Sequence, residues 1–172
     1  MSDISYERRL VIGIKYAKRF TGDRIDYNEL LSIIEIARWA PSIGNIQSWE
    51  VIIVEDPIEI KKLARLHPLG YIYEKAGGLF FIVVDPEQSP HYLIDSGSLI
   101  AYIALASSIK GYSVLIIDLR DNPVFKTELN IPPLKYLAAL VAVGKEASST
   151  TPSILPRKPL EHIVYRNKYG LR

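Results

Sequence analysis

Residues 37–49 read ARWAPSIGNIQSW and join a strongly helical run to a strongly strand-like run. Pro41 should end the helix, because the residue before a proline is driven out of the α region. The run that follows, residues 50–54, is apolar and β-branched and is typical of a strand. Between the two, residues 42–48 place serine, asparagine and glutamine side chains in one short turn. Such a polar loop between rigid elements suits a binding site, although a plain helix-to-strand connection fits the same spacing.

The bulk properties describe an ordinary globular chain. Its 172 residues are 48% hydrophobic and 23% charged, which predicts one domain over residues 1–172 with a substantial core. The net charge of +2 does not suggest a nucleic-acid partner. The absence of cysteine excludes disulfides, thiolate metal sites and cysteine nucleophiles. Abundant isoleucine, tyrosine, lysine and glutamate favour a thermophilic source.

No apolar run reaches the roughly 18 residues that a membrane helix needs, so we expect no membrane partner. The first nine residues lack the apolar core of a signal peptide. We therefore expect a cytoplasmic protein.

The N-terminal run, residues 5–18, carries apolar residues at the spacing of one helical face, which predicts a first helix. Its other face is basic and includes Lys15 and Lys18. That face is either solvated or an anion site, since such a cation cluster suits a phosphate. A second helix is predicted over residues 27–39, with Asp26 as its N-cap and a glutamate three residues later to complete a capping box.

The rest of the chain alternates strands and helices. Strands are predicted at residues 50–54, 79–84, 112–117 and 136–143, and helices at 57–66, 93–110 and 121–131. The 93–110 helix is apolar on more than one face, which places it in the centre of a domain or at a subunit interface. The tail from residue 145 is rich in proline and should be extended. Together these elements predict a helix-flanked sheet.

Several chemistries are excluded by the motifs that the chain lacks. There is no GxGxxG fingerprint, no Walker loop, no GxSxG elbow and no glycosidase pattern of paired acids. The three histidines are far apart in sequence and lack metal-ligand spacing, so we expect no metal. With no support for a catalytic side chain, chemistry borne by a cofactor is favoured, because the protein then needs only to bind and orient it.

The run APSxxNxQxW at residues 40–49 resembles the signature of the nitroreductase family of flavoenzymes. Three other stretches agree with that family in order along the chain: residues 19–25, 95–112 and 143–161. The resemblance thus extends over nearly the whole sequence.

The resemblance implies an α+β fold, a mixed or antiparallel sheet flanked by helices, in an intimate homodimer with an extended C-terminal tail. It implies FMN bound without a covalent bond between the subunits. NADH or NADPH would reduce the flavin in a ping-pong mechanism. The oxidants would be nitroaromatics, quinones or similar small-molecule acceptors.

The resemblance also implies roles for particular residues. The loop would contact the flavin through the backbone of Pro41, Ser42 and Ile43, from the other subunit, and through the Asn45 and Gln47 amides, which can donate and accept.

A second group of residues would complete the site. Asp118 would lie at a second flavin-contact strand. Lys15, Tyr16, Lys18 and Arg157 would hold the phosphate, which favours guanidinium and ammonium partners.

The remaining expectations concern packing and departures from the family pattern. Trp39 and Trp49 are expected to pack in the core. Ile14 and Tyr16 stand where many family members have arginine and serine, and the bulky Leu119 stands where glycine is frequent. These departures motivate an alternative function, a nitroreductase-fold protein with weakened or altered cofactor use that acts as a binding or regulatory module.

Overall fold

A four-stranded antiparallel sheet forms the centre of the molecule in the computed structural model, which describes residues 13–147 and 157–170. The strand order is β1-β2-β4-β3, and each neighbouring pair is antiparallel. The strands are β1 (Trp49–Val54), β2 (Gly78–Val84), β3 (Ser113–Asp118) and β4 (Tyr136–Gly144). The predicted helix-flanked sheet is confirmed, with strand boundaries within one residue of the sequence-based ranges.

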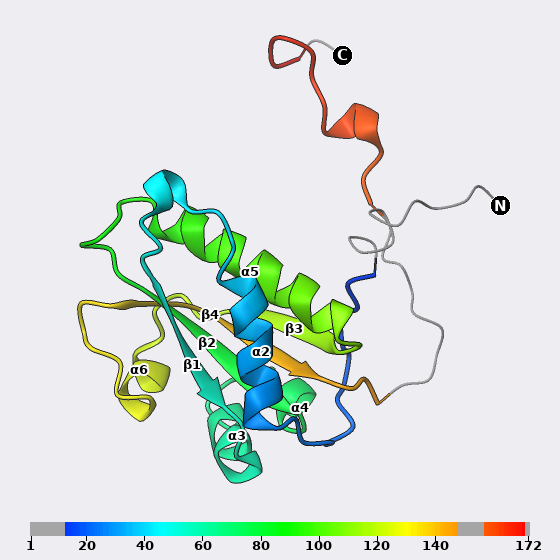
Figure 1. Ribbon diagram of the computed structural model, residues 1–172, viewed down its shortest axis with the longest axis vertical. Coiled ribbons are helices and arrows are strands. Elements are labelled where there is room, and N and C mark those ends of the chain that lie inside the picture. Colours follow the sequence, from blue (N-terminus) through cyan, green and yellow to red (C-terminus); the bar gives the residue numbers. More distant parts are fainter. Residues whose placement is uncertain (1–12, 148–156, 171–172) are drawn as a thin grey trace, which may run out of the picture.

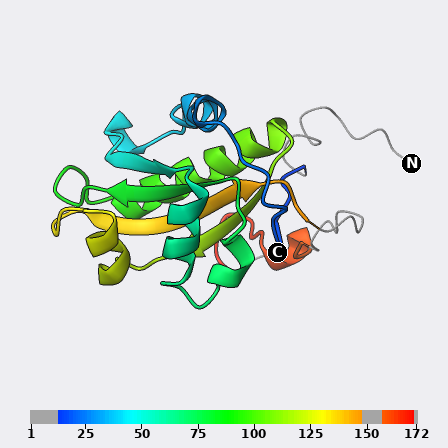
Figure 2. The same ribbon diagram turned by 90° about the horizontal axis from the view of Figure 1, so that it is seen from below.

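Helices cover both faces of this sheet (Figures 1 and 2). One face carries α2 (Tyr27–Ala37) and α5 (Tyr92–Ile109), and the other carries α3 (Pro57–Ala64), α4 (Gly70–Tyr73) and α6 (Pro123–Glu128). Two short 3-10 turns complete the described elements, η1 (Ile43–Asn45) and η2 (Leu160–His162).

The strand β2 explains how one sheet supports two cores. All seven of its residues are buried. Its alternate side chains enter different clusters: Phe81 packs on the α3 and α6 side, whereas Phe80 and Ile82 pack on the α2 and α5 side. A strand covered on both faces is a continuous apolar run, which is why the sequence predicted it well.

The helix α2 begins where its cap predicts. Asp26 accepts a hydrogen bond from the Asn28 N–H at 2.9 Å, which satisfies a backbone donor of the first turn. The reciprocal half of the capping box is not formed. Glu29 instead makes an ion pair with Lys110 at 3.1 Å and so ties the start of α2 to the end of α5.

The long helix α5 packs one side on the sheet through Leu99, Ile103 and Ala106. Its opposite side carries an apolar stripe at helical spacing, which consists of Ile94, Gly97, Ala101, Leu105 and Ile109. Ile94 is 65% exposed and Ile109 is 54% exposed. The α5 helix is long and apolar enough to cross a membrane. The core helix of a soluble domain can have the same length and composition.

The predicted first helix is wrong over residues 13–18, the part of it that the structure describes. This segment is extended and runs beside β3, with a parallel bridge between Tyr16 and Val114. The Val114 N–H donates to the Lys15 carbonyl at 2.9 Å, and the Ala17 N–H donates to the Val114 carbonyl at 2.8 Å. Because β3 is an edge strand with unpaired backbone groups, this pairing outweighs the helical periodicity of the sequence. Residues 5–12 lie outside the described part.

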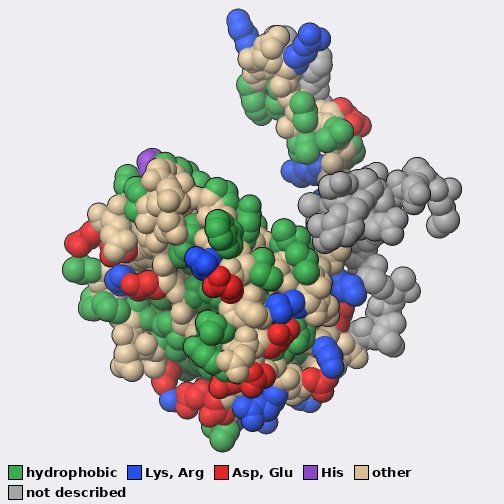
Figure 3. Space-filling model, viewed as in Figure 1, with side chains coloured by type: hydrophobic (Ala, Val, Ile, Leu, Met, Phe, Trp, Pro, Cys, Tyr) green, Lys and Arg blue, Asp and Glu red, His purple; other side chains and the backbone are tan. Residues whose placement is uncertain are grey.

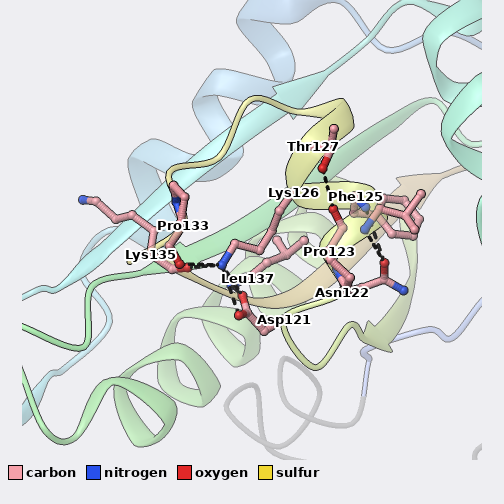
Figure 4. A network of polar contacts seen from close by, with 10 residues as sticks. Asp121, Asn122, Pro123, Phe125, Lys126, Thr127, Pro133, Lys135 and Leu137 are labelled. Atoms are coloured by element: carbon pink, nitrogen blue, oxygen red, sulfur yellow. Dashed lines mark hydrogen bonds and ion pairs between the residues drawn. The ribbon is translucent and has the colours of Figure 1, made fainter.

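A partly buried lysine, Lys126, holds the connection between β3 and β4 together (Figure 4). The Lys126 Nζ donates to the Pro133 carbonyl at 2.9 Å, to the Lys135 carbonyl at 2.7 Å and to the Asp121 carboxylate at 3.1 Å. The other oxygen of Asp121 accepts the Leu137 N–H at 2.9 Å. All three donors of the ammonium are therefore used, which offsets the cost of burying it.

Replacing Lys126 with methionine should lower stability by about 2 kcal/mol, because the apolar stem is kept while charged hydrogen bonds are lost. For a chain of this size the melting temperature should fall by roughly 4–8 °C. The matched control is Lys61→Met on the exposed side of α3, which should change stability by less than about 0.5 kcal/mol. Equal melting temperatures for the two variants would show that the network contributes nothing.

The C-terminal segment 157–170 lies beyond the globule in Figure 1. All of its residues except Tyr165 are exposed, and its one regular element is η2. Leu160, Ile163 and Val164 each expose more than half of their surface. The predicted extended tail is confirmed over this range.

Candidate functional site

The loop at residues 41–48 has an unusual backbone. Gly44, Asn45 and Gln47 all adopt left-handed conformations, with φ values of 63°, 57° and 54°. For a residue with a side chain this conformation costs roughly 1–2 kcal/mol. Such strained residues persist where the surroundings fix them, and they cluster at functional sites.

The two amide side chains of the loop are joined to each other. The Gln47 Nε2 donates to the Asn45 Oδ1 and to the Asn45 carbonyl, each at 3.1 Å. The Gln47 N–H donates to the Ser42 Oγ at 3.1 Å. In the described part of the chain, the Asn45 Nδ2 and the Gln47 Oε1 make no hydrogen bond, and both side chains are exposed. The loop thus offers one fixed donor and one fixed acceptor to a ligand.

The loop lies against the start of α5 (Figure 1). The Ile43 N–H donates to the Asp95 Oδ1 at 2.9 Å. Asp95 is 1% exposed and lies in the first turn of α5. In the sequence, Asp95 stands out only as part of the family-like stretch at residues 95–112. Its position could have been noticed because it is an acidic residue in an otherwise apolar helix, and a buried acidic side chain requires a partner.

The predicted phosphate residues Lys15, Tyr16 and Lys18 are all exposed on the extended segment beside β3. This segment begins near the end of α5, where the Ser108 Oγ donates to the Gly13 carbonyl at 2.7 Å. The loop contacts Asp95 at the other end of the same helix. With a rise of 1.5 Å per residue, positions 95 and 108 of α5 are about 20 Å apart. One chain therefore does not bring the loop and these cations together.

Arg157 is exposed at the beginning of the C-terminal segment. Figures 1 and 2 both draw this segment and residues 13–20 on the side of the molecule where α5 ends. The predicted cations therefore lie on one side, away from the loop.

Asp118 ends β3 at the same end of the sheet as the loop, because β1 begins and β2 ends there. It is exposed and pairs with Arg120 at 2.8 Å. Its neighbour Leu119 is 4% exposed and packs in the α3 and α6 core, so its bulk lies inside the domain.

A pair of tyrosines lies at this end of the sheet, and one of them, Tyr136, is near Asp118. The rings of Tyr92 and Tyr136 are 5.4 Å apart, which joins the start of α5 to the start of β4. Burial and the nearby Asp118 carboxylate raise the pKa of Tyr136. Tyr136 therefore stays protonated at neutral pH and can donate a hydrogen bond.

The two tryptophans differ from each other. Trp49 is half-buried and packs against the α2 and α5 core, as expected. Trp39 is 74% exposed, so its predicted core position is wrong. The Arg38 guanidinium lies 5.5 Å from the centre of its ring. Residue type alone could not place Trp39, because its burial depends on where α2 ends relative to the sheet.

No group of three or more histidine, cysteine or acidic side chains in the described ranges is arranged to hold a metal ion. Amides, hydroxyls and separated cations remain as the binding groups. This donor set suits an organic ligand with hydrogen-bonding edges and an anionic end.

Residues 17–71 match the model of the Nitroreductase family. The resemblance to that family is confirmed. A curated relative, an NADPH-dependent oxidoreductase of Staphylococcus epidermidis, is 24% identical over 194 residues, which cover 98% of this chain and 75% of the relative.

Solved structures share the nitroreductase fold. An FMN-dependent nitroreductase from Clostridium difficile R20291 superimposes with a TM-score of 0.81 at 17% identity, over 93% of this chain and 98% of that one. A nitroreductase family protein from Streptococcus pneumoniae TIGR4 gives 0.80 at 20% identity, over 92% and 98%. At such identities these likenesses show the fold alone.

The nitroreductase match contains the loop and Lys18, whereas Lys15, Tyr16, Asp118 and Arg157 lie outside it. The roles of these residues toward a ligand therefore stay predictions.

Proposed function

We propose that the chain is an FMN-dependent oxidoreductase that works as a homodimer and takes reducing equivalents from NADH or NADPH. Its oxidants would be nitroaromatics, quinones or similar small molecules. The names of the FMN-dependent and NADPH-dependent proteins that it resembles support this proposal.

The observation that carries the proposal is the separation of the binding groups. The loop lies at one end of α5 and the exposed segment with Lys15 and Lys18 lies at the other. Two chains that pair along their α5 helices in opposite directions would place the loop of one beside the cations of the other. Each of two equivalent sites would then combine both groups, as an isologous dimer requires.

The surface of α2 and α5 suits such a contact. Figure 3 shows hydrophobic side chains emerging over this face between scattered charged groups, with the densest gathering of charged side chains at the lower rim. The exposed residues include all of the α5 stripe except the half-buried Leu105, together with Leu31 at 45%, Ile36 at 41% and Trp39 at 74%. Apolar surface on this scale is typical of a protein–protein interface.

The residues of the site fit FMN chemically. The Asn45 Nδ2 and the Gln47 Oε1 would bond to the polar edge of the isoalloxazine, and backbone groups of residues 41–43 would frame it. Lys15, Lys18 and Arg157 would balance the phosphate charge, with the Tyr16 hydroxyl as a further donor. When bound, FMN supplies the hydride acceptor and donor chemistry, so no side chain needs to be catalytic. Asp118 would contact the flavin from the end of β3.

One observation favours an alternative function, that of a binding or regulatory module. Ile14 occupies the position of a family arginine, and it is half-buried against the α2 and α5 core. It cannot act as a phosphate ligand. If the remaining cations do not compensate, the protein would use the same fold as a binding or regulatory module.

Titration with FMN, followed by the quenching of flavin fluorescence, separates the two functions. The oxidoreductase requires saturable binding of one FMN per chain and a dimer by light scattering at micromolar concentration. A monomer that takes up no FMN would contradict the proposal and favour the module.

A further inference from the structure

The carboxylate of Asp95 is not explained by the helix that carries it. Among the described residues, neither oxygen of the Asp95 carboxylate accepts a hydrogen bond from α5, and no side chain caps the start of this helix. The side chain instead leaves the helix and accepts the N–H of Ile43, 52 positions earlier, at 2.9 Å.

This contact anchors the part of the loop that carries Asn45 and Gln47. Among the other hydrogen bonds of residues 41–48 in the described ranges, one leaves the loop, where the Asp85 N–H donates to the Ser48 carbonyl at 2.9 Å just before β1 begins. The bonds of residues 42–47 stay within the loop, such as those from Gln47 to Ser42 and from the Asn45 N–H to the Ser42 carbonyl. Hydrogen bonds within the loop can preserve the shape of the loop, but they cannot fix the position of the loop against α5. The strained backbone at Asn45 and Gln47 requires such fixing by its surroundings.

Asp95 is also a costly residue for stability alone. Its Oδ2 is buried and has no hydrogen-bond partner among the described residues. A buried carboxylate oxygen without a partner destabilises the fold, and an apolar side chain of similar size would avoid that cost. Proteins tolerate such local violations mainly at functional sites.

We propose that Asp95 is a positioning residue of the site. Its Oδ1 fixes the Ile43 N–H, and through Ile43 it holds Asn45 and Gln47 in the orientation that presents their free amide atoms. That the presented ligand is FMN rests on the function proposed above, whereas the anchoring of the loop does not.

Two substitutions separate positioning from stability. Asp95→Asn keeps an acceptor oxygen for the Ile43 N–H, and Asp95→Leu fills the site without one. Hydrogen exchange of the peptide covering residues 41–48 is measured on the protein without FMN, and FMN affinity is measured separately. The Asp95→Leu protein should melt at the temperature of the parent protein or higher. Hydrogen exchange in its loop should nevertheless accelerate about tenfold. Its FMN affinity should also fall about tenfold, which corresponds to roughly 1.4 kcal/mol. Asp95→Asn should stay within about threefold of the parent protein on both measurements.

The matched control is Asp56→Ala, which removes the cap of α3 on the opposite face of the sheet, where Asp56 accepts the Ile58 N–H at 2.8 Å. It should lower the melting temperature without changing exchange at residues 41–48. Parent-like loop exchange in Asp95→Leu, or an equal acceleration in Asp95→Asn, would overturn the inference. If the parent protein binds no FMN, the proposed function fails, and the exchange measurements alone decide the role of Asp95.

Discussion

Replacing Ala101 with glutamate should leave a folded monomer that no longer holds FMN. Ala101 is exposed in the middle of the α5 stripe, and glutamate is a good helix former, so the fold of one chain should tolerate it. In the dimer, however, each new carboxylate would be buried without a partner, which is strongly unfavourable. If the site combines groups from two chains, a monomer loses at least two charged contacts to the ligand. FMN affinity should then fall by about 100-fold or more.

Light scattering and FMN titration at the same protein concentration check this prediction. The matched control is Ile58→Glu, which adds the same charge at a residue that is 74% exposed in α3, on the opposite face of the sheet. It should remain a dimer with unchanged FMN affinity. An Ala101→Glu protein that is still dimeric, or a monomer that binds FMN tightly, would exclude α5 as the interface that completes the site.

Replacing Arg157 with alanine should weaken FMN binding by about 1.5–3 kcal/mol, the range for a hydrogen bond to a charged group. This corresponds to roughly a 10- to 150-fold rise in Kd. The phosphate favours a guanidinium partner. Because isoleucine stands at position 14, where many family members have arginine, Arg157 would have to supply that guanidinium. Arg157→Lys should restore part of the affinity, because it keeps the charge but loses the bidentate geometry.

The control for this prediction is Arg166→Ala, an exposed arginine in the same C-terminal segment. Its FMN affinity should equal that of the parent protein, so that a general effect of net charge is excluded. Equal affinities for the Arg157 and Arg166 variants would remove Arg157 from the site. The predicted loss should also shrink as salt is added, since exposed charges are screened.

The sequence predicted the elements whose pattern is local. The β2 strand is apolar without interruption, because both of its faces are covered, and α5 is long, apolar and followed by Gly111 with φ 84°. Asp26 and Asp56 are both N-caps, as their positions before apolar helical runs indicate. In these cases the periodicity and the end signals agree with the tertiary structure.

The errors arose where distant contacts decide the structure. Residues 13–18 have a helical pattern, but the open edge of β3 draws them into an extended conformation. Glu29 leaves its capping box for Lys110, a partner 81 positions away.

The candidate site shows the same division. The loop residues were predicted from their own polarity and resemblance, and the structure describes their left-handed backbone and paired amides. Asp95 was missed as the anchor, because its partner Ile43 is an apolar residue that contributes only a backbone N–H. No side-chain pattern in a sequence reveals such a bond. The separation of the cations from the loop likewise emerges only once both ends of α5 are placed.

The absorbance spectrum of the purified protein is the most direct test of whether it is a flavin-dependent oxidoreductase. The oxidoreductase predicts a yellow protein, or one that becomes yellow when FMN is added and the excess is removed, with the bands of oxidised flavin. Those bands should bleach when NADH or NADPH is added without air and return when a quinone or nitroaromatic is supplied. A protein that stays colourless after incubation with FMN, or a bound flavin that neither nucleotide bleaches, would contradict the proposed function.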